Sequence, residues 1–257
     1  MVTTPAPANQ PSANQRGAHR RTKLIAAIDT HSLAHGQQLA TQLNGVVDAI
    51  KLGFEFTYSC GLEAVRALGA KQGLFLDLKL HDIPNTVAQG VAALAPLGPL
   101  LMTIHASGGS AMVRAARNAL DEAFSANPGA RPKLIAVTVL TSLDGAALLE
   151  LGVDATPAQQ VVRLGRLAIE AGADGLVCSA HEIAPLRQAL GEAPLLVVPG
   201  IRPAGSAHND QKRIMTPGQA AEAGADWIVV GRPITQAADP AAAARAIQAE
   251  LAAHTNP

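Results

Sequence analysis

The sequence predicts an α/β protein that folds as a single-domain (β/α)8 TIM barrel. Its 257 residues match the usual length of one such barrel, about 250 residues. Short apolar runs alternate with longer segments, rich in Ala and Leu, that have helical periodicity. The short runs are continuously apolar, which is typical of parallel strands covered on both faces. An open doubly wound sheet is the alternative arrangement of the same units.

The apolar runs provide the strands that a closed barrel needs. We expect strands at residues 24–28, 47–52, 74–78, 101–104, 134–140, 175–178, 195–198 and 227–230. Because hydrophobic residues make up 48% of the chain, one domain can bury a large core. We therefore expect residues 23–257 to form the barrel. Residues 1–22, rich in Ala, Pro, Asn and Gln, are expected to form a disordered tail.

The composition argues against several classes of function. Lys and Arg together number 20, as do Asp and Glu, so no basic excess indicates binding to nucleic acid. Cys60 and Cys178 lack both CxxC spacing and the density of a disulfide scaffold, which favours reduced thiols in a cytoplasmic protein. No apolar stretch reaches the roughly 18 residues that a membrane helix needs. A small molecule is the expected partner.

Polar side chains or glycines follow nearly every apolar run, where a barrel has its chemistry. They are Asp29, Lys51, Asp77 with Lys79, His105, Thr141 with Ser142, Ser179, Gly200 with Arg202, and Gly231 with Arg232. The segment between Pro199 and Thr216 has few apolar residues, which predicts a long mobile loop after the seventh strand. Loops in this position often close over ligands.

The densest group of charges lies in residues 75–86 (FLDLKLHDIPNT). Asp77 and Lys79 are two residues apart on a strand, so both project to the barrel interior. Asp82 follows in the next loop. Such charges tolerate a desolvated pocket only if their signs alternate, and Lys51 at the end of the neighbouring strand can supply the further cation. An ion-pair network that merely closes the barrel mouth is the alternative. Charged residues, however, are almost never fully buried without reason, and the carboxyl ends of barrel strands are where activity lies.

This segment resembles the signature of the orotidine 5'-phosphate decarboxylase family, and further segments agree. These are residues 27–29 (AID), 50–53 (IKLG), 137–142 (VTVLTS), 198–202 with 211–217, and 231–234 (GRPI). The resemblance runs in order from about residue 24 to residue 247. It implies a TIM-barrel enzyme that converts orotidine 5'-phosphate into UMP and carbon dioxide, the last step of de novo UMP synthesis. Neither a cofactor nor a metal is implied.

The resemblance also implies a role for each charged residue. Removal of the carboxylate from C6 of the pyrimidine leaves a carbanion without an electron sink, so a neighbouring ammonium is the natural stabiliser. Lys79 would fill this place and deliver the proton to C6. Asp77 would hold Lys79 and lie near the substrate carboxylate, and whether its repulsion of that group assists the reaction stays open. Lys51 would pair with Asp77 and contact the ribose.

By the same resemblance, Asp82 and Thr86 reach into the active site of a partner subunit, so the charge network would be complete only in a homodimer. Ile83, between them, is also expected to contact substrate. The other expected substrate-binding residues are Asp29 (ribose), Thr141 (pyrimidine), Gly231 and Arg232 (phosphate), Arg202 and Gln211 on the long loop, and Pro199. We interpret His105 as a supporting residue, because Lys79 already fills the role of proton donor.

Other functions are compatible with parts of the pattern. Magnesium-dependent sugar-phosphate decarboxylases and aldolases share the Asp-x-Lys-x-x-Asp core, but they have an acidic metal ligand where this chain has Lys51. An epimerase-like barrel would need metal-binding histidines at the strand ends. A nucleotide sensor without activity has no use for the charge network. A bifunctional UMP synthase is disfavoured because no second domain is apparent.

Overall fold

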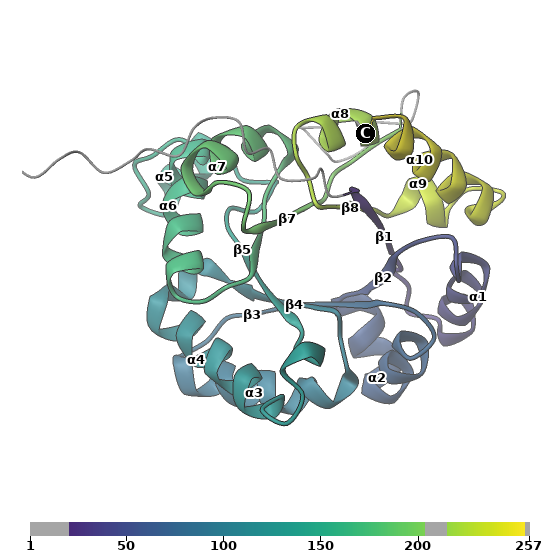
Figure 1. The fold of residues 1–257 in the computed structure, drawn as a ribbon, viewed down its shortest axis with the longest axis horizontal. Coiled ribbons are helices and arrows are strands. Elements are labelled where there is room, and N and C mark those ends of the chain that lie inside the picture. The colour runs from purple at the N-terminus through teal and green to yellow at the C-terminus, as the bar shows by residue number, and fades with distance from the viewer. Residues whose placement is uncertain (1–20, 204–214, 255–257) are drawn as a thin grey trace, which may run out of the picture.

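The computed structural model describes residues 21–203 and 215–254 and shows a closed barrel of parallel strands in chain order. Pairing of β1 with β8 closes the sheet, and Figure 1 shows the helices outside the ring of strands. The strands are β1 (Lys23–Ala27), β2 (Ala49–Leu52), β3 (Leu74–Leu80), β4 (Leu101–His105), β5 (Lys133–Val137), β6 (Gly175–Val177), β7 (Leu195–Val198) and β8 (Trp227–Val230). The predicted TIM barrel is confirmed, and the open sheet is excluded.

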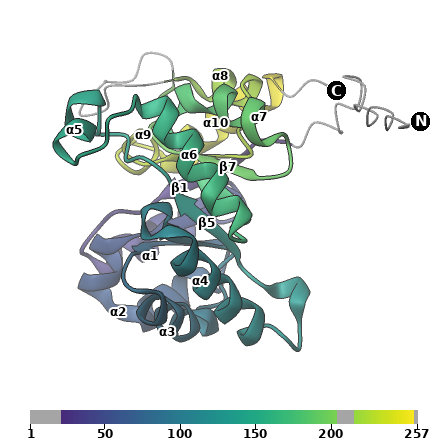
Figure 2. The same ribbon diagram turned by 90° about the vertical axis from the view of Figure 1, so that its left-hand side faces the viewer.

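The helices cover the outside of the barrel. Seen from the side, the helices of the first half of the chain lie on one side of the molecule and those of the second half lie on the other (Figure 2). They are α1 (Leu33–Leu43), α2 (Phe54–Gly69), α3 (Pro84–Leu94), α4 (Gly109–Ala123), α5 (Gly145–Glu150), α6 (Pro157–Glu170), α7 (Ile183–Leu190), α8 (Pro217–Glu222), α9 (Arg232–Thr235) and α10 (Pro240–His254). Local sequence sets several of their starts. In α6, for example, Pro157 follows Thr156, whose side chain forms a capping box with Gln159.

Two apolar layers result from the alternation of side chains along each strand. Leu24 and Ala26 of β1 belong to the large cluster between strands and helices, whereas Ile25 and Ala27 belong to a smaller cluster inside the barrel. Phe75, Leu101, Ile135, Val197 and Trp227 are among the other members of this inner cluster. The inner layer fills the amino-terminal half of the barrel, so the polar residues that follow it on the same faces lie near the carboxyl ends of the strands.

At the amino-terminal end of the barrel, a carboxylate stands directly before β2, β6 and β8. Asp48, Asp174 and Asp226 each accept a hydrogen bond of 2.8 Å from the backbone N–H of the second residue of the preceding strand. Each carboxylate also pairs with an arginine: Arg21, Arg131 and Arg187 respectively. The pairs of Asp174 and Asp226 are largely buried, whereas Arg21 is half exposed. All three pairs lie opposite the carboxyl ends of the strands and stabilise the barrel rather than a site.

Several predicted boundaries differ from the observed ones. The fifth strand ends at Val137 instead of residue 140, because Thr138 turns its hydroxyl onto the carbonyl of Val177 at 2.8 Å. The third strand extends to Leu80, two residues beyond the prediction. Arg21 and Thr22, assigned to the tail, are attached to the barrel, since Thr22 is buried and donates to the carbonyl of Ala225. Within the described residues, no helix is long and apolar enough to cross a membrane.

Candidate active site

Four of the predicted residues form one charge network at the carboxyl ends of β1, β2 and β3. The Nζ atom of Lys79 lies 2.8 Å from Oδ2 of Asp77, and the Nζ atom of Lys51 lies 3.6 Å from the same oxygen. Lys51 also contacts Oδ1 of Asp29 at 3.1 Å. The charges alternate in the order Asp29, Lys51, Asp77, Lys79, which is the arrangement that buried ions require.

Strand alternation explains why these side chains meet. Lys51 follows Ala49, and Asp77 follows Phe75, on the inward faces of neighbouring strands. Lys79 continues the inward face of β3, but its backbone has a φ of 44°. It is the only residue other than glycine with positive φ in the described part of the chain. A left-handed conformation at a side-chain-bearing residue costs on the order of 1–3 kcal/mol and is concentrated at functional sites.

The electrostatic setting keeps Asp77 ionised. Burial alone would raise the pKa of Asp77, whose exposed fraction is 7%. The positive charges of Lys51 and Lys79, together with hydrogen bonds from Lys79 and Thr103, outweigh burial and hold this pKa below its ordinary value. Asp77 is therefore a carboxylate at neutral pH.

A cavity of about 210 Å³ opens beside the network at the barrel mouth. Lys51, Asp77 and Lys79 provide its charged side. The opposite side includes Thr141 and Pro199, which the sequence had singled out. Apolar residues form the rest of its lining: Phe75, Val137, Val139, Leu140, Val177, Val197 and Val229. The cavity thus offers an apolar surface facing an ammonium and a carboxylate, which suits a planar ligand that carries charge at one edge.

Three residues near the network were not assigned a site role from the sequence. The Lys79 ammonium lies 5.4 Å from the centre of the Phe54 ring, which itself stacks on Tyr58. Thr103, on the inward face of β4, donates to Asp77. Reading β4 with the same two-residue period as β3 would have placed Thr103 between Leu101 and His105 on the inner face.

His105 lies at the end of β4, with its ring 5.2 Å from that of His81. Burial lowers the pKa of His105, and the charges of His81 and Lys79 lower it further, against a smaller opposing effect of Asp77. His105 is therefore neutral at pH 7, and the cations next to Asp77 are the ammonium groups of Lys51 and Lys79.

Asp82, Ile83 and Thr86 do not join the cavity. They lie at the start of α3, all three are exposed, and Oδ1 of Asp82 accepts the backbone N–H of Ile83 at 2.6 Å. The exposed fraction of Ile83 is 67%, which is among the higher values for large apolar side chains in the described residues. Within a single chain, these residues have no contact with the Lys–Asp network.

The predicted phosphate residues lie around the ends of β7 and β8. Gly231 and Arg232 begin α9 directly after β8, and Gly231 lies beside Ala27 at the end of β1. Arg202 is buried, donates to the carbonyl of Ile201 at 3.1 Å, and bonds through its backbone N–H to Met215. Gln211, and most of the long loop predicted after β7, lie outside the described residues.

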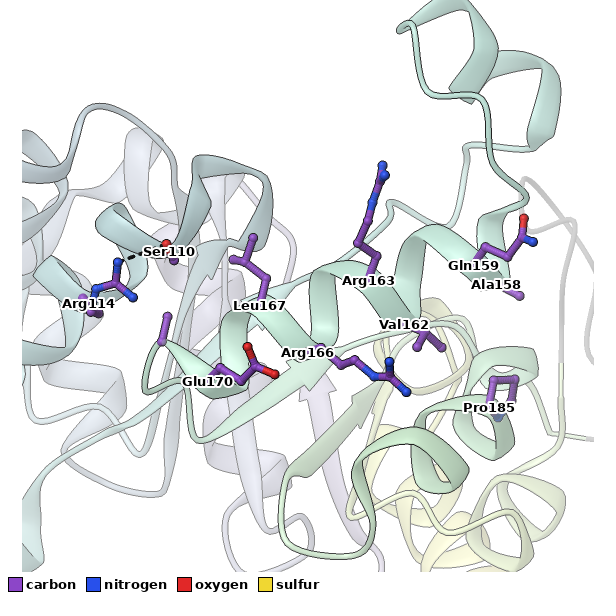
Figure 3. Close-up of a pocket in the computed structure, with 11 residues that line it drawn as sticks. Ser110, Arg114, Ala158, Gln159, Val162, Arg163, Arg166, Leu167, Glu170 and Pro185 are labelled. Carbon is purple, nitrogen blue, oxygen red and sulfur yellow. Dashed lines mark hydrogen bonds between the residues drawn. The ribbon is translucent and has the colours of Figure 1, made fainter.

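A larger groove of about 900 Å³ lies on the outside of the barrel between α4, α6 and α7 (Figure 3). Arg114 on its rim donates to Ser110, and Arg166 extends along α6 toward Pro185. None of the charged strand-end residues lines this groove. Among the described residues, no group of three or more His, Cys, Asp or Glu side chains is placed to hold a metal ion. The barrel mouth is therefore the candidate active site.

A (β/α)8 barrel with a buried Lys–Asp–Lys array at the carboxyl ends of its strands defines a barrel enzyme that acts on a small charged molecule. Comparison with known proteins identifies which one. Residues 22–247 match the model of the orotidine 5'-phosphate decarboxylase / HUMPS family. The chain belongs to this family.

Relatives and solved structures agree with the assignment. The chain is 70% identical over 233 residues to an orotidine 5'-phosphate decarboxylase of Gluconobacter oxydans, covering 91% of this chain and 98% of the relative. It is 52% identical to the protein of that name from an Anaeromyxobacter species, covering 89% and 98% of the two chains. The crystal structure of orotidine 5'-phosphate decarboxylase from Lactobacillus acidophilus superposes with a TM-score of 0.78 at 39% identity, covering 90% of this chain and 99% of that one.

Proposed function

We propose that this protein decarboxylates orotidine 5'-phosphate to UMP in pyrimidine biosynthesis. The chain is a carboxy-lyase of the family to which it belongs. The alternating network of Asp29, Lys51, Asp77 and Lys79 beside an apolar cavity is the observation that best supports this reaction. Cleavage of the bond between C6 and the carboxylate leaves an electron pair on C6, and carbon dioxide departs.

In the proposed reaction, Lys79 acts without a cofactor. Its ammonium, fixed by Asp77 at 2.8 Å, stabilises the developing carbanion by electrostatics and then transfers a proton to C6. Solvent returns a proton to the lysine. Asp77 stays ionised and holds the ammonium, while Lys51 balances the charge of Asp77 and contacts the ribose together with Asp29.

Binding energy from the rest of the nucleotide orders the reacting ring. The cavity of about 210 Å³ lies below the usual range of roughly 300–1,000 Å³ for small-molecule sites, so it accommodates the pyrimidine and leaves ribose and phosphate at the rim. Thr141 and Pro199 line the cavity and contact the ring. Gly231 and Arg232, together with Arg202 and Gln211 from the loop after β7, hold the phosphate.

The active enzyme is a homodimer in which Asp82, Ile83 and Thr86 complete the site of the partner. Their exposure at the mouth supports this, as do the exposed rings of Phe54, near Lys79, and Tyr58, because exposed apolar side chains are common on association surfaces. The expected location is the cytoplasm. The predicted tail, as far as residue 20, lies outside the described residues.

Turnover in excess EDTA tests the reaction. Purified protein should convert orotidine 5'-phosphate to UMP, followed by the loss of orotate-type ultraviolet absorbance. Lys79→Ala should lose at least about 10⁴-fold in kcat, because it removes both the charge and the proton donor. Lys133→Ala, at the opposite end of the barrel, is the matched control and should keep full activity. An inactive wild type that binds the nucleotide would favour a sensor, and activity on a sugar phosphate only with magnesium would favour the metal-dependent relatives.

Mixing two inactive variants tests the dimer. If Asp82 acts in the partner's site, a heterodimer of Lys79→Ala and Asp82→Ala contains one intact site. Statistical mixing should then restore about one quarter of the wild-type activity per subunit. If Asp82 acts only within its own chain, both sites stay damaged and the mixture stays inactive.

A further inference from the structure

Thr103 is a fully buried residue that forms hydrogen bonds with Asp77 and Lys79 of the charge network. It lies on the inward face of β4 with an exposed fraction of 0%, between Leu101 and His105. Its hydroxyl accepts the backbone N–H of Lys79 at 2.8 Å and donates to Oδ1 of Asp77 at 3.0 Å. Thr103 does not line the cavity, so a ligand bound there has no contact with it.

The hydroxyl stands at an irregularity in the sheet. Leu76 of β3 pairs with Met102 of β4, but the next pair joins Leu80 to Ile104. Between these two pairs, β3 uses four residue steps where β4 uses two, so the strand bulges and Lys79 takes its positive φ there. A backbone N–H displaced from a ladder needs another acceptor, and the Thr103 side chain provides it for Lys79.

The two oxygens of the Asp77 carboxylate therefore have different partners. Because the Thr103 oxygen accepts from Lys79, its proton points to Oδ1 of Asp77. This leaves Oδ2 for the ammonium groups of Lys79 and Lys51, at 2.8 and 3.6 Å. One hydroxyl therefore fixes both the plane of the carboxylate and the backbone from which the Lys79 side chain extends.

We propose that Thr103 is a positioning residue that sets the geometry of Asp77 and Lys79 for the decarboxylation. The proposal rests on the proposed function. A positioning role acts on the chemical step more than on binding, because the geometry of the ammonium and carboxylate matters most as charge develops on C6.

A pair of substitutions separates the hydroxyl from the bulk of the side chain. Thr103→Val keeps the shape and removes both hydrogen bonds, whereas Thr103→Ser keeps the hydroxyl and removes a buried methyl group. Loss of hydrogen bonds to a buried charged group predicts a fall in kcat of roughly 10- to 100-fold for Thr103→Val. The KM should change by less than about threefold, since Thr103 does not line the cavity. Thr103→Ser should keep kcat within about threefold of wild type while lowering the melting temperature.

The pH dependence of kcat gives a second measurement, which would not change if Thr103 served only in packing. Thr103 is one of the groups that keep the pKa of Asp77 low. Without its hydroxyl, Asp77 becomes protonated at higher pH, so the acid limb of kcat should shift upward in Thr103→Val and stay in place in Thr103→Ser.

The outcomes are distinct. A folded Thr103→Val with wild-type kcat and an unmoved acid limb would overturn the proposal. A folded Thr103→Ser variant whose kcat falls by more than about tenfold would also overturn the proposal. If Thr103→Val does not fold, the result for Thr103→Ser alone tests the proposal. A wild type that does not decarboxylate orotidine 5'-phosphate would instead refute the proposed function itself, before either variant is considered.

Discussion

Replacement of Asp77 by Asn removes one negative charge from between two lysines without changing the shape of the side chain. At an effective dielectric constant of about 20, a pair of unit charges attracts by about 6 kcal/mol at 2.8 Å and about 5 kcal/mol at 3.6 Å. Desolvation offsets much of this attraction. Removal of one partner from a buried pair typically costs about 3–5 kcal/mol. Because a quarter of the Lys79 side chain is exposed, we expect the lower end of that range, about 3 kcal/mol.

The loss should depend on pH in a defined direction. The pKa of Asp77 is lowered in the folded state, so its contribution to stability is present above the ordinary pKa of about 4 and is lost as pH falls through the folded value. At pH 7, Asp77→Asn should lower the melting temperature by about 6–12 °C. The gap between the two proteins should begin to narrow below about pH 4, where the unfolded wild-type chain takes up a proton at Asp77, and should close as pH falls through the lowered pKa of the folded state.

Thermal unfolding of both proteins between pH 3.5 and pH 8 gives the assay, with pH values chosen around the ordinary carboxyl pKa of about 4. Asp29→Asn is the matched control, because Asp29 pairs with Lys51 at 3.1 Å but its side chain is 53% exposed. That control should cost less than about 1 kcal/mol. Equal or greater stability of Asp77→Asn at pH 7 would refute the reasoning, as would a gap that stays constant into the acid range.

Three further predictions concern the scaffold. Asp174→Asn weakens the pairing with Arg131 at 2.8 and 2.9 Å and the hydrogen bond from the backbone N–H of Leu134. Unfolding experiments should show a fall of about 1.5–3 kcal/mol in the free energy of unfolding, while kcat is unchanged. This loss should vanish in acid, because the pKa of Asp174 is lowered. Gly175→Ala would bring a Cβ atom to 2.4 Å from the carbonyl oxygen of Leu195 and should cost about 2–4 kcal/mol of stability in urea unfolding. Gly145→Ala is the control: its Cβ atom would meet nothing within 4 Å, so stability should change by less than about 1 kcal/mol. Burial raises the pKa of Cys178, so mass spectrometry after iodoacetamide treatment of the native protein should find Cys60 modified and Cys178 unmodified; modification of Cys178 before unfolding would contradict its burial.

The barrel was predictable because its strands are mostly apolar and a polar residue or a glycine lies at or just after the end of nearly every one. The same alternation predicted that Asp77 and Lys79 would share the inward face, and the contact of 2.8 Å between them confirms that they meet. Lys51 joins them because it lies at the end of the adjacent strand, with an inward Ala49 two residues before it.

Features that depend on contacts between distant segments could not be predicted. Residues 137–142 continue the apolar pattern of the fifth strand, yet the strand ends at Val137 because Thr138 bonds to the carbonyl of Val177 on β6. The bulge at Lys79 likewise depends on the Thr103 hydroxyl from β4, for which nothing within residues 75–86 gives a signal.

The predicted tail boundary was displaced for the same reason. Thr22 is buried because the carbonyl of Ala225, more than 200 residues away, accepts its hydroxyl proton. Whether Asp82, Ile83 and Thr86 act in a partner's site stays a prediction, since a single chain contains only half of such an interface.

In the proposed mechanism, an ammonium at position 79, held by Asp77, makes the reaction possible. Lys79→Cys removes it, and treatment with 2-bromoethylamine converts the thiol into an aminoethyl side chain that restores an ammonium at nearly the same distance from the backbone. The rate of orotidine 5'-phosphate decarboxylation should fall by at least about 10³-fold in Lys79→Cys and recover to within about tenfold of similarly treated wild type. Unmodified Lys79→Cys with near wild-type turnover, or no recovery when mass spectrometry shows complete aminoethylation of residue 79, would contradict the account.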